Sequence, residues 1–100
     1  MSELRQADKH NVALLLADQL DTFAAGSITE SQLREWCATH ASSFPVSLLL
    51  SEIERYLGDA DRRARDRRHD NMQEATLRQL ITLLRHGASA SELSRVSFFG

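Results

Sequence analysis

Apolar residues recur three and four positions apart along most of this chain, which is the spacing of one face of an α-helix. Four separate stretches follow this pattern, so four amphipathic helices are predicted. Their apolar stripes comprise, in chain order, Val12, Leu15, Leu16, Leu20 and Phe23; Leu33, Trp36, Cys37 and His40; Val46, Leu49, Leu50, Ile53, Tyr56 and Leu57; and Leu77, Leu80, Ile81 and Leu84.

Polar and conformationally special residues mark the ends of the first two helices. The first helix is predicted over residues 7–25, and Gly26 directly after it suits a left-handed C-terminal cap. Thr29 and Gln32 have the spacing of a capping box, in which each side chain accepts a backbone N–H of the other. This pair predicts the start of a second helix that ends near Ala41.

The second half of the chain has two further start signals separated by a polar stretch. Pro45 suits the first turn of a helix that stops at Gly58. Residues 58–70 carry no large apolar side chain, so this stretch is predicted to be either a solvated helix held by opposite charges or a loop. Asn71 is the predicted N-cap of the last long helix, which runs to Arg85.

These elements predict an all-α fold, an antiparallel four-helix bundle in which turns join consecutive helices. We assign residues 1–87 to the bundle and residues 88–100 to a C-terminal tail or short docking helix. Residues 89–92 have the pattern of a helix start. Three apolar side chains suited to docking on the body follow: Val96, Phe98 and Phe99.

Length and composition agree with one small domain. The chain has 100 residues, of which 42% are hydrophobic and 26% charged, enough to bury a core without disulfides or metal. Four glycines and one proline are too few turn residues for an all-β fold. No apolar run is long enough to span a membrane, and the first residues lack the apolar core of a signal peptide. The expected location is therefore cytoplasmic.

Charge is distributed unevenly along the chain. The net charge is −2, yet residues 1–54 hold eight acidic and three basic residues, and residues 55–100 hold six acidic and nine basic ones. Such asymmetry is typical either of a charged face for a partner or of ordinary solvated helix faces. The basic half contains an arginine run interrupted by aspartates. We interpret it as a self-paired segment, a partner-binding patch or a phosphate-binding patch formed by Arg62, Arg63, Arg65, Arg67 and Arg68.

The residue types that catalysis or metal binding needs do not form a motif. The four histidines are scattered, and the calcium-loop-like start at Asp59 lacks the glycine and glutamate that such loops require. Cys37 and His40 share a helix face, but Cys37 also lies on an apolar stripe and is predicted to be a buried structural cysteine. We therefore predict neither enzyme activity nor a metal or cofactor.

The order of these features resembles the colicin D-type immunity proteins of bacteria. The resemblance spans roughly residues 12–85 and begins with the N-terminal apolar helix. It then rests on the stretches FAAGSIT at 23–29, QL at 32–33, LLSEI at 49–53, DAD at 59–61 and EATLR at 74–78.

The resemblance implies a four-helix bundle that binds and blocks a cognate toxin, often an RNase with a cationic substrate site. An acidic surface can occupy a basic cleft built for nucleic acid, and complementary charge speeds association. On this basis we expect the partner-binding residues to be Asp59, Asp61 and Glu52, with Glu30 and Glu35 extending the patch.

Three alternatives fit the same sequence. A phage-encoded inhibitor of a host defence nuclease is a second form of the inhibitor hypothesis. A nucleic-acid-binding regulatory module would use the five arginines named above, and its affinity would fall steeply with salt. An adaptor or dimerising bundle would use the apolar tail at residues 96–99.

Overall fold

The computed structural model describes the backbone of residues 2–98 and the side chains of residues 12–98. The secondary structure of this part of the chain is entirely helical, which confirms the predicted all-α class. Within it, no helix combines the length and the apolar character that a membrane crossing requires. The helices are α1 (Ser2–Ala24), α2 (Glu30–Thr39), α3 (Val46–Gly58), α4 (Ala60–Arg65), α5 (Arg67–Arg85) and α6 (Ala90–Leu93).

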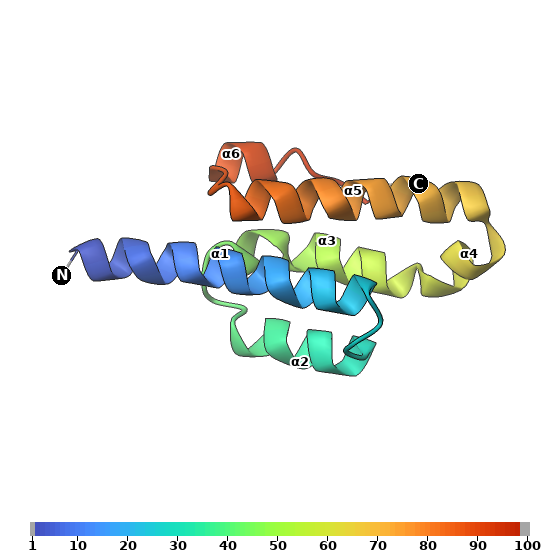
Figure 1. Cartoon of the computed structure of the whole chain (residues 1–100), viewed down its shortest axis with the longest axis horizontal. Coiled ribbons are helices and arrows are strands. Elements are labelled where there is room, and N and C mark those ends of the chain that lie inside the picture. Colours follow the sequence, from blue (N-terminus) through green and yellow to red (C-terminus); the bar gives the residue numbers. More distant parts are fainter. Residues whose placement is uncertain (1, 99–100) are drawn as a thin grey trace.

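The four longer helices lie alongside one another, close to the long dimension of the molecule (Figure 1). α1 and α3 run in one direction and α2 and α5 in the other (Figure 1). α1 packs chiefly on α5, whereas α2 packs on α1 and α3. The first part of α1 projects beyond the other helices (Figure 1), so the molecule measures 49 Å by 25 Å by 20 Å.

One hydrophobic core joins the long helices and the C-terminal tail. On α1 the buried positions are Ala13, Leu16, Ala17 and Leu20, whereas Leu15, which the pattern assigns to the core, is 44% exposed. The buried face of α1 is therefore turned away from Leu15, which lies on the opposite side of the helix.

The helix-end signals at Gly26 and Thr29 are confirmed. Gly26 has a φ of +80°, and the Ser27 N–H donates to the Thr22 carbonyl at 3.0 Å in a Schellman-type cap. The Thr29 N–H donates to Gln32 Oε1 at 2.8 Å, and the Gln32 N–H donates to Thr29 Oγ1 at 3.1 Å. These caps set the point at which the chain leaves α1 and enters α2.

Two predicted boundaries shift by a few residues. α1 begins at Ser2 rather than near Ala7, because the intervening residues are good helix formers that lack an apolar stripe. Pro45 precedes α3 as its N-cap and is not part of its first turn. The Pro45 carbonyl accepts the Leu49 N–H at 3.1 Å, so regular helix starts one residue later than expected.

The largest correction concerns the polar stretch between the third and fourth predicted helices. Residues 60–65 form α4, and α5 begins directly after Asp66, so the predicted start at Asn71 is wrong. Asp66 is the N-cap, because its Oδ1 accepts the His69 N–H at 3.2 Å. His69 and Gln73 are buried and hydrogen-bonded. Polar contacts, which a search for apolar stripes does not detect, therefore hold the first turns of α5.

The C-terminal tail folds back onto the body. A second capping box starts the short helix α6, and Leu93, Val96 and Phe98 are buried in the core. Val96 and Phe98 therefore dock as expected, whereas Phe99 lies outside the described residues. Phe98 packs against Tyr56 of α3, with ring centroids 5.0 Å apart.

Candidate functional site

A groove of about 360 Å³ lies between α2 and α3. One wall comprises Ala38 on α2 and Ala41 just after that helix, and both side chains are small, so an apolar depression remains opposite Leu50 of α3. The lining positions on α3 are three and four apart and span two turns of one face. The groove is lined by Arg34, Cys37, Ala38, Ala41, Leu50, Ile53, Glu54 and Leu57.

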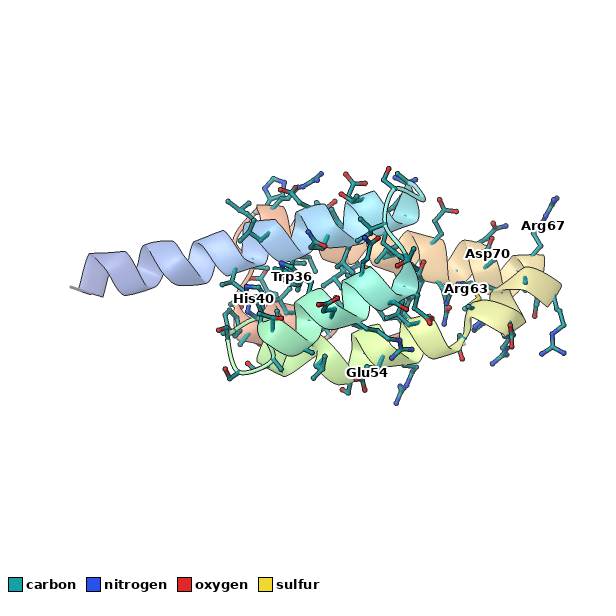
Figure 2. The ribbon with its side chains drawn as sticks, turned by 90° about the horizontal axis from the view of Figure 1, so that it is seen from below. Trp36, His40, Glu54, Arg63, Arg67 and Asp70 are labelled. Carbon is teal, nitrogen blue, oxygen red and sulfur yellow. The ribbon has the colours of Figure 1, made fainter. Side chains whose placement is uncertain are left out.

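The two helices that line this groove carry exposed carboxylates. Glu54 lines it and lies at the outer edge of α3 (Figure 2). Glu30 precedes Arg34 by one turn of α2 and pairs with it, with 3.6 Å between Nε and Oε2. Glu35 is exposed on the same helix. We call the groove and these three glutamates the acidic face. Residues 30–61 as a whole hold six acidic and two basic side chains, a net charge of −4.

The cysteine in the groove is suited to packing, not to nucleophilic attack. Burial raises the pKa of the Cys37 thiol to about 11, and the negative charge of Glu54 adds to the effect. The nucleophilic form of cysteine is the thiolate, which this environment disfavours. His40 stacks on Trp36, with ring centroids 4.2 Å apart (Figure 2). Cys37 is buried, as predicted.

The structure assigns Asp59 to an internal hydrogen-bond network. Its Oδ2 accepts Gln73 Nε2 at 2.9 Å and lies 3.3 Å from His69 Nε2. The hydrogen bond from Gln73 holds the pKa of the Asp59 carboxyl below its usual value, with a smaller contribution from His69. Burial has the opposite effect and is outweighed. Asp59 therefore joins the α3–α4 junction to α5.

Gln73 is the centre of this network. Its Nε2 also donates to the Phe98 carbonyl at 3.1 Å, and its Oε1 accepts Arg63 Nη1 at 2.7 Å. Arg63 also donates to the Tyr56 carbonyl and lies over the Tyr56 ring, 3.9 Å from its centroid. One arginine of the predicted basic run is thus part of the internal structure (Figure 2).

Glu52 of α3 binds the backbone of the C-terminal tail, as Gln73 of α5 does. Its Oε2 accepts the Phe98 N–H at 3.0 Å, and its Oε1 lies 3.7 Å from Arg55 Nη1. Glu52 and Asp59, two of the predicted partner-binding residues, therefore lie with the tail and are separate from Glu30 and Glu35 on α2. Asp61 is exposed on α4.

The remaining four arginines of the basic run are exposed at the end of the molecule formed by α4 and the start of α5. We call Arg62, Arg65, Arg67 and Arg68 the arginine corner. Among the described residues, none of the four lies within ion-pair distance of a carboxylate, although the charge of Arg62 contributes to the lowered pKa of Asp59. The segment is therefore solvated and helical, but without direct ion pairs between these four arginines and its aspartates. Within the same part of the chain, no group of three or more ligand-type side chains is arranged to hold a metal ion.

Two important residues were missed by reasoning from the sequence. Glu54 is not among the predicted partner-binding residues, although the run Leu48-Leu49-Leu50 indicates that α3 has a second apolar surface beside it. Gln73 was overlooked because it is polar. Its spacing of four from both His69 and Leu77 places it on the buried stripe of α5.

Comparison with known proteins finds no relative of this chain. No family model matches the chain, and no curated protein or solved structure is significantly similar to it. The resemblance to immunity proteins therefore stays a prediction, and the functional argument rests on the acidic face and the arginine corner.

Proposed function

We propose that this protein is a non-enzymatic inhibitor that binds a basic protein on the acidic face, most concretely an immunity protein that neutralises a nuclease toxin in the cytoplasm. The observation that carries this proposal is the combination of an apolar groove, lined by Glu54, with exposed glutamates on α2. A phage-encoded inhibitor of a host nuclease would use the same surface. The proposal takes α1, α2, α3 and α5 as the antiparallel four-helix bundle that supports it.

The mechanism is occlusion of a substrate site. A nuclease needs a basic cleft to hold phosphates, and a surface that carries carboxylates in place of phosphates can cover that cleft. Opposite charge raises the rate of encounter, while an apolar contact in the groove slows dissociation. Neither step needs a nucleophile, which agrees with the protonated, buried thiol of Cys37.

The test of this proposal has two stages. A native pull-down from the source cells would identify a stoichiometric protein, whose nuclease activity would then be titrated with the purified chain. The proposal expects inhibition that saturates at equimolar ratio. Affinity would then be measured by calorimetry for a variant of the acidic face, Glu30→Gln/Glu35→Gln/Glu54→Gln, and for a control with the same charge change on α1 and α5, Asp18→Asn/Asp21→Asn/Glu74→Gln.

We expect the acidic-face variant to bind about tenfold more weakly, or about 1.4 kcal/mol, mainly through slower association. The control should change affinity much less. Filling the groove provides a second measurement: Ala38→Trp should block binding, whereas Ala75→Trp on the exposed side of α5 should not. Equal losses in the paired variants, or a partner without nuclease activity, would contradict the proposal.

A further inference from the structure

In the part of the chain that the structure describes, the four side chains of the arginine corner form no ion pair with a carboxylate. Arg62 acts on Asp59 only through its charge, as a minor cause of the lowered pKa of that carboxyl. Three other arginines are paired: Arg34 with Glu30, Arg78 with Glu74, and Arg85 with two aspartates of α1. Within residues 12–98, Arg65 is the one member of the arginine corner with a side-chain hydrogen bond, a 3.4 Å contact from Nε to the carbonyl of Asp61 in its own helix.

The aspartates of residues 58–70 neutralise the arginine corner only in part, because Asp59 and Asp66 accept hydrogen bonds from other residues. Asp59 accepts from Gln73 and His69 on its inner side, and Asp66 caps α5 by accepting the His69 N–H. With Arg63 turned to the body, the four arginines of the corner face Asp61 and Asp70, a balance of +2, whereas residues 58–70 as a whole hold five arginines and four aspartates, or +1. The outer surface of the corner is therefore more basic than the composition of residues 58–70 suggests.

The corner is also held in a defined shape. Arg63 joins α4 to the body through Tyr56 and Gln73, and the Asp66 cap fixes the break between α4 and α5. In Figure 2, Arg67 points away from the helices at the end of the molecule, whereas Arg63 lies close to the body. Exposed guanidinium groups on an ordered corner lose less freedom on binding than the same groups on a disordered chain.

We infer that the arginine corner binds the phosphate backbone of nucleic acid, as a second site separate from the acidic face. Guanidinium groups match phosphate geometry through paired N–H donors. Residues 58–70 contain no aromatic side chain on which a base could stack, so recognition is by charge and not by sequence. None of the four arginines lines the groove, so a basic protein and a phosphate chain occupy different surfaces.

The test uses the full chain and fluorescently labelled single-stranded RNA and DNA of about 20 nucleotides, with anisotropy measured at several salt concentrations. We expect saturable binding at low salt, little difference between the base sequences tried, and a slope of log K against log salt of about −3, the value for four phosphate contacts on a single strand. The RNA and DNA arms distinguish the two sources of the same phosphate backbone.

A matched pair of variants assigns the binding to the corner. Arg62→Gln/Arg65→Gln/Arg67→Gln/Arg68→Gln should lower affinity at least about tenfold, because it removes every charge of the corner. A control changes four arginines elsewhere and has the same net charge: Arg34→Gln/Arg55→Gln/Arg78→Gln/Arg95→Gln. The control should retain most of the affinity. Circular dichroism would verify that both variants keep their helices, since glutamine is a good helix former.

Three outcomes would overturn the inference. The first is no binding of the wild-type chain to either oligonucleotide at low salt. The second is an equal loss in the two variants, which would show that total charge and not the corner is responsible. The third is binding to anionic phospholipid vesicles without binding to oligonucleotides. None of these outcomes bears on the acidic face, so this inference and the proposed function fail independently.

Discussion

Single side chains in this protein take their chemical character from what surrounds them. The surroundings raise the pKa of Cys37 and lower the pKa of Asp59. Burial and Glu54 raise the pKa of the Cys37 thiol to about 11, whereas hydrogen bonds from Gln73 and His69 lower the pKa of the Asp59 carboxyl. Each shift is a consequence of packing that can be measured directly.

We predict that Cys37 reacts slowly with aromatic disulfide reagents near pH 8 and that Glu54→Gln raises the rate about two- to threefold, because removing the nearby negative charge stabilises the thiolate. Burial is the larger cause of the raised pKa, so the gain is modest. The rate would be followed by absorbance, with Glu35→Gln as the control. Identical rates for the wild type and Glu54→Gln would show that Glu54 does not act on the thiol.

Asp59 should stabilise the fold at neutral pH and cease to do so in acid. Its folded-state pKa lies below the unfolded value of about 3.9, so its contribution is present above that pH and is lost as the pH falls through the folded value. The difference in Tm between the wild type and Asp59→Asn should therefore be constant near pH 7 and close below about pH 4. A difference that persists at pH 2, or one absent at pH 7, would contradict this assignment.

Some helices of this protein begin and end where neighbouring residues in the sequence dictate, whereas others depend on contacts with residues far along the chain. The caps at Gly26 and Thr29 follow from a few neighbouring residues, and the structure contains both. α4 and the first turns of α5 depend instead on contacts with distant residues, including Gln73 with Phe98 and Arg63 with Tyr56. Local signals are readable in the sequence because they need no partner from elsewhere in the chain.

The two glycines at helix ends give a matched comparison. Gly26 and Gly58 both have open space where a Cβ would lie, but only Gly26 has a positive φ. Gly26→Ala should lower the free energy of unfolding by about 1 kcal/mol because of the left-handed backbone. Gly58→Ala, within the last turn of α3, should raise it by about 0.5 kcal/mol. Urea denaturation would measure both, and changes of the same sign would refute the conformational argument.

Across the molecule, the C-terminal tail completes the core instead of trailing from it. Phe98 is among the largest fully buried side chains, and its backbone N–H and carbonyl are held by Glu52 and Gln73. The tail thereby ties α3 to α5, which are joined in the chain through α4. A surface contact made by an apolar tail, as the adaptor hypothesis requires, is not available to Phe98 in this arrangement.

Phe98→Ala should therefore lower the free energy of unfolding by about 3–5 kcal/mol, the usual cost of removing a buried phenyl ring. Met72→Ala, at a side chain that is 51% exposed, should change it by less than about 0.5 kcal/mol. Thermal and urea denaturation of the two variants would check both values. A small effect of Phe98→Ala would mean that the tail detaches in solution.

Most of the helices, their stripes and two of their caps follow from the sequence, because periodicity and capping depend on residues within a few turns of one another. The sequence does not determine the exposure of Leu15, the helical state of residues 60–65 and 67–70, or the roles of Asp59 and Glu52. The same carboxylate is a surface charge or an internal acceptor depending on what another helix brings within hydrogen-bond distance. That choice, and with it the separation of the acidic face from the arginine corner, belongs to the tertiary structure.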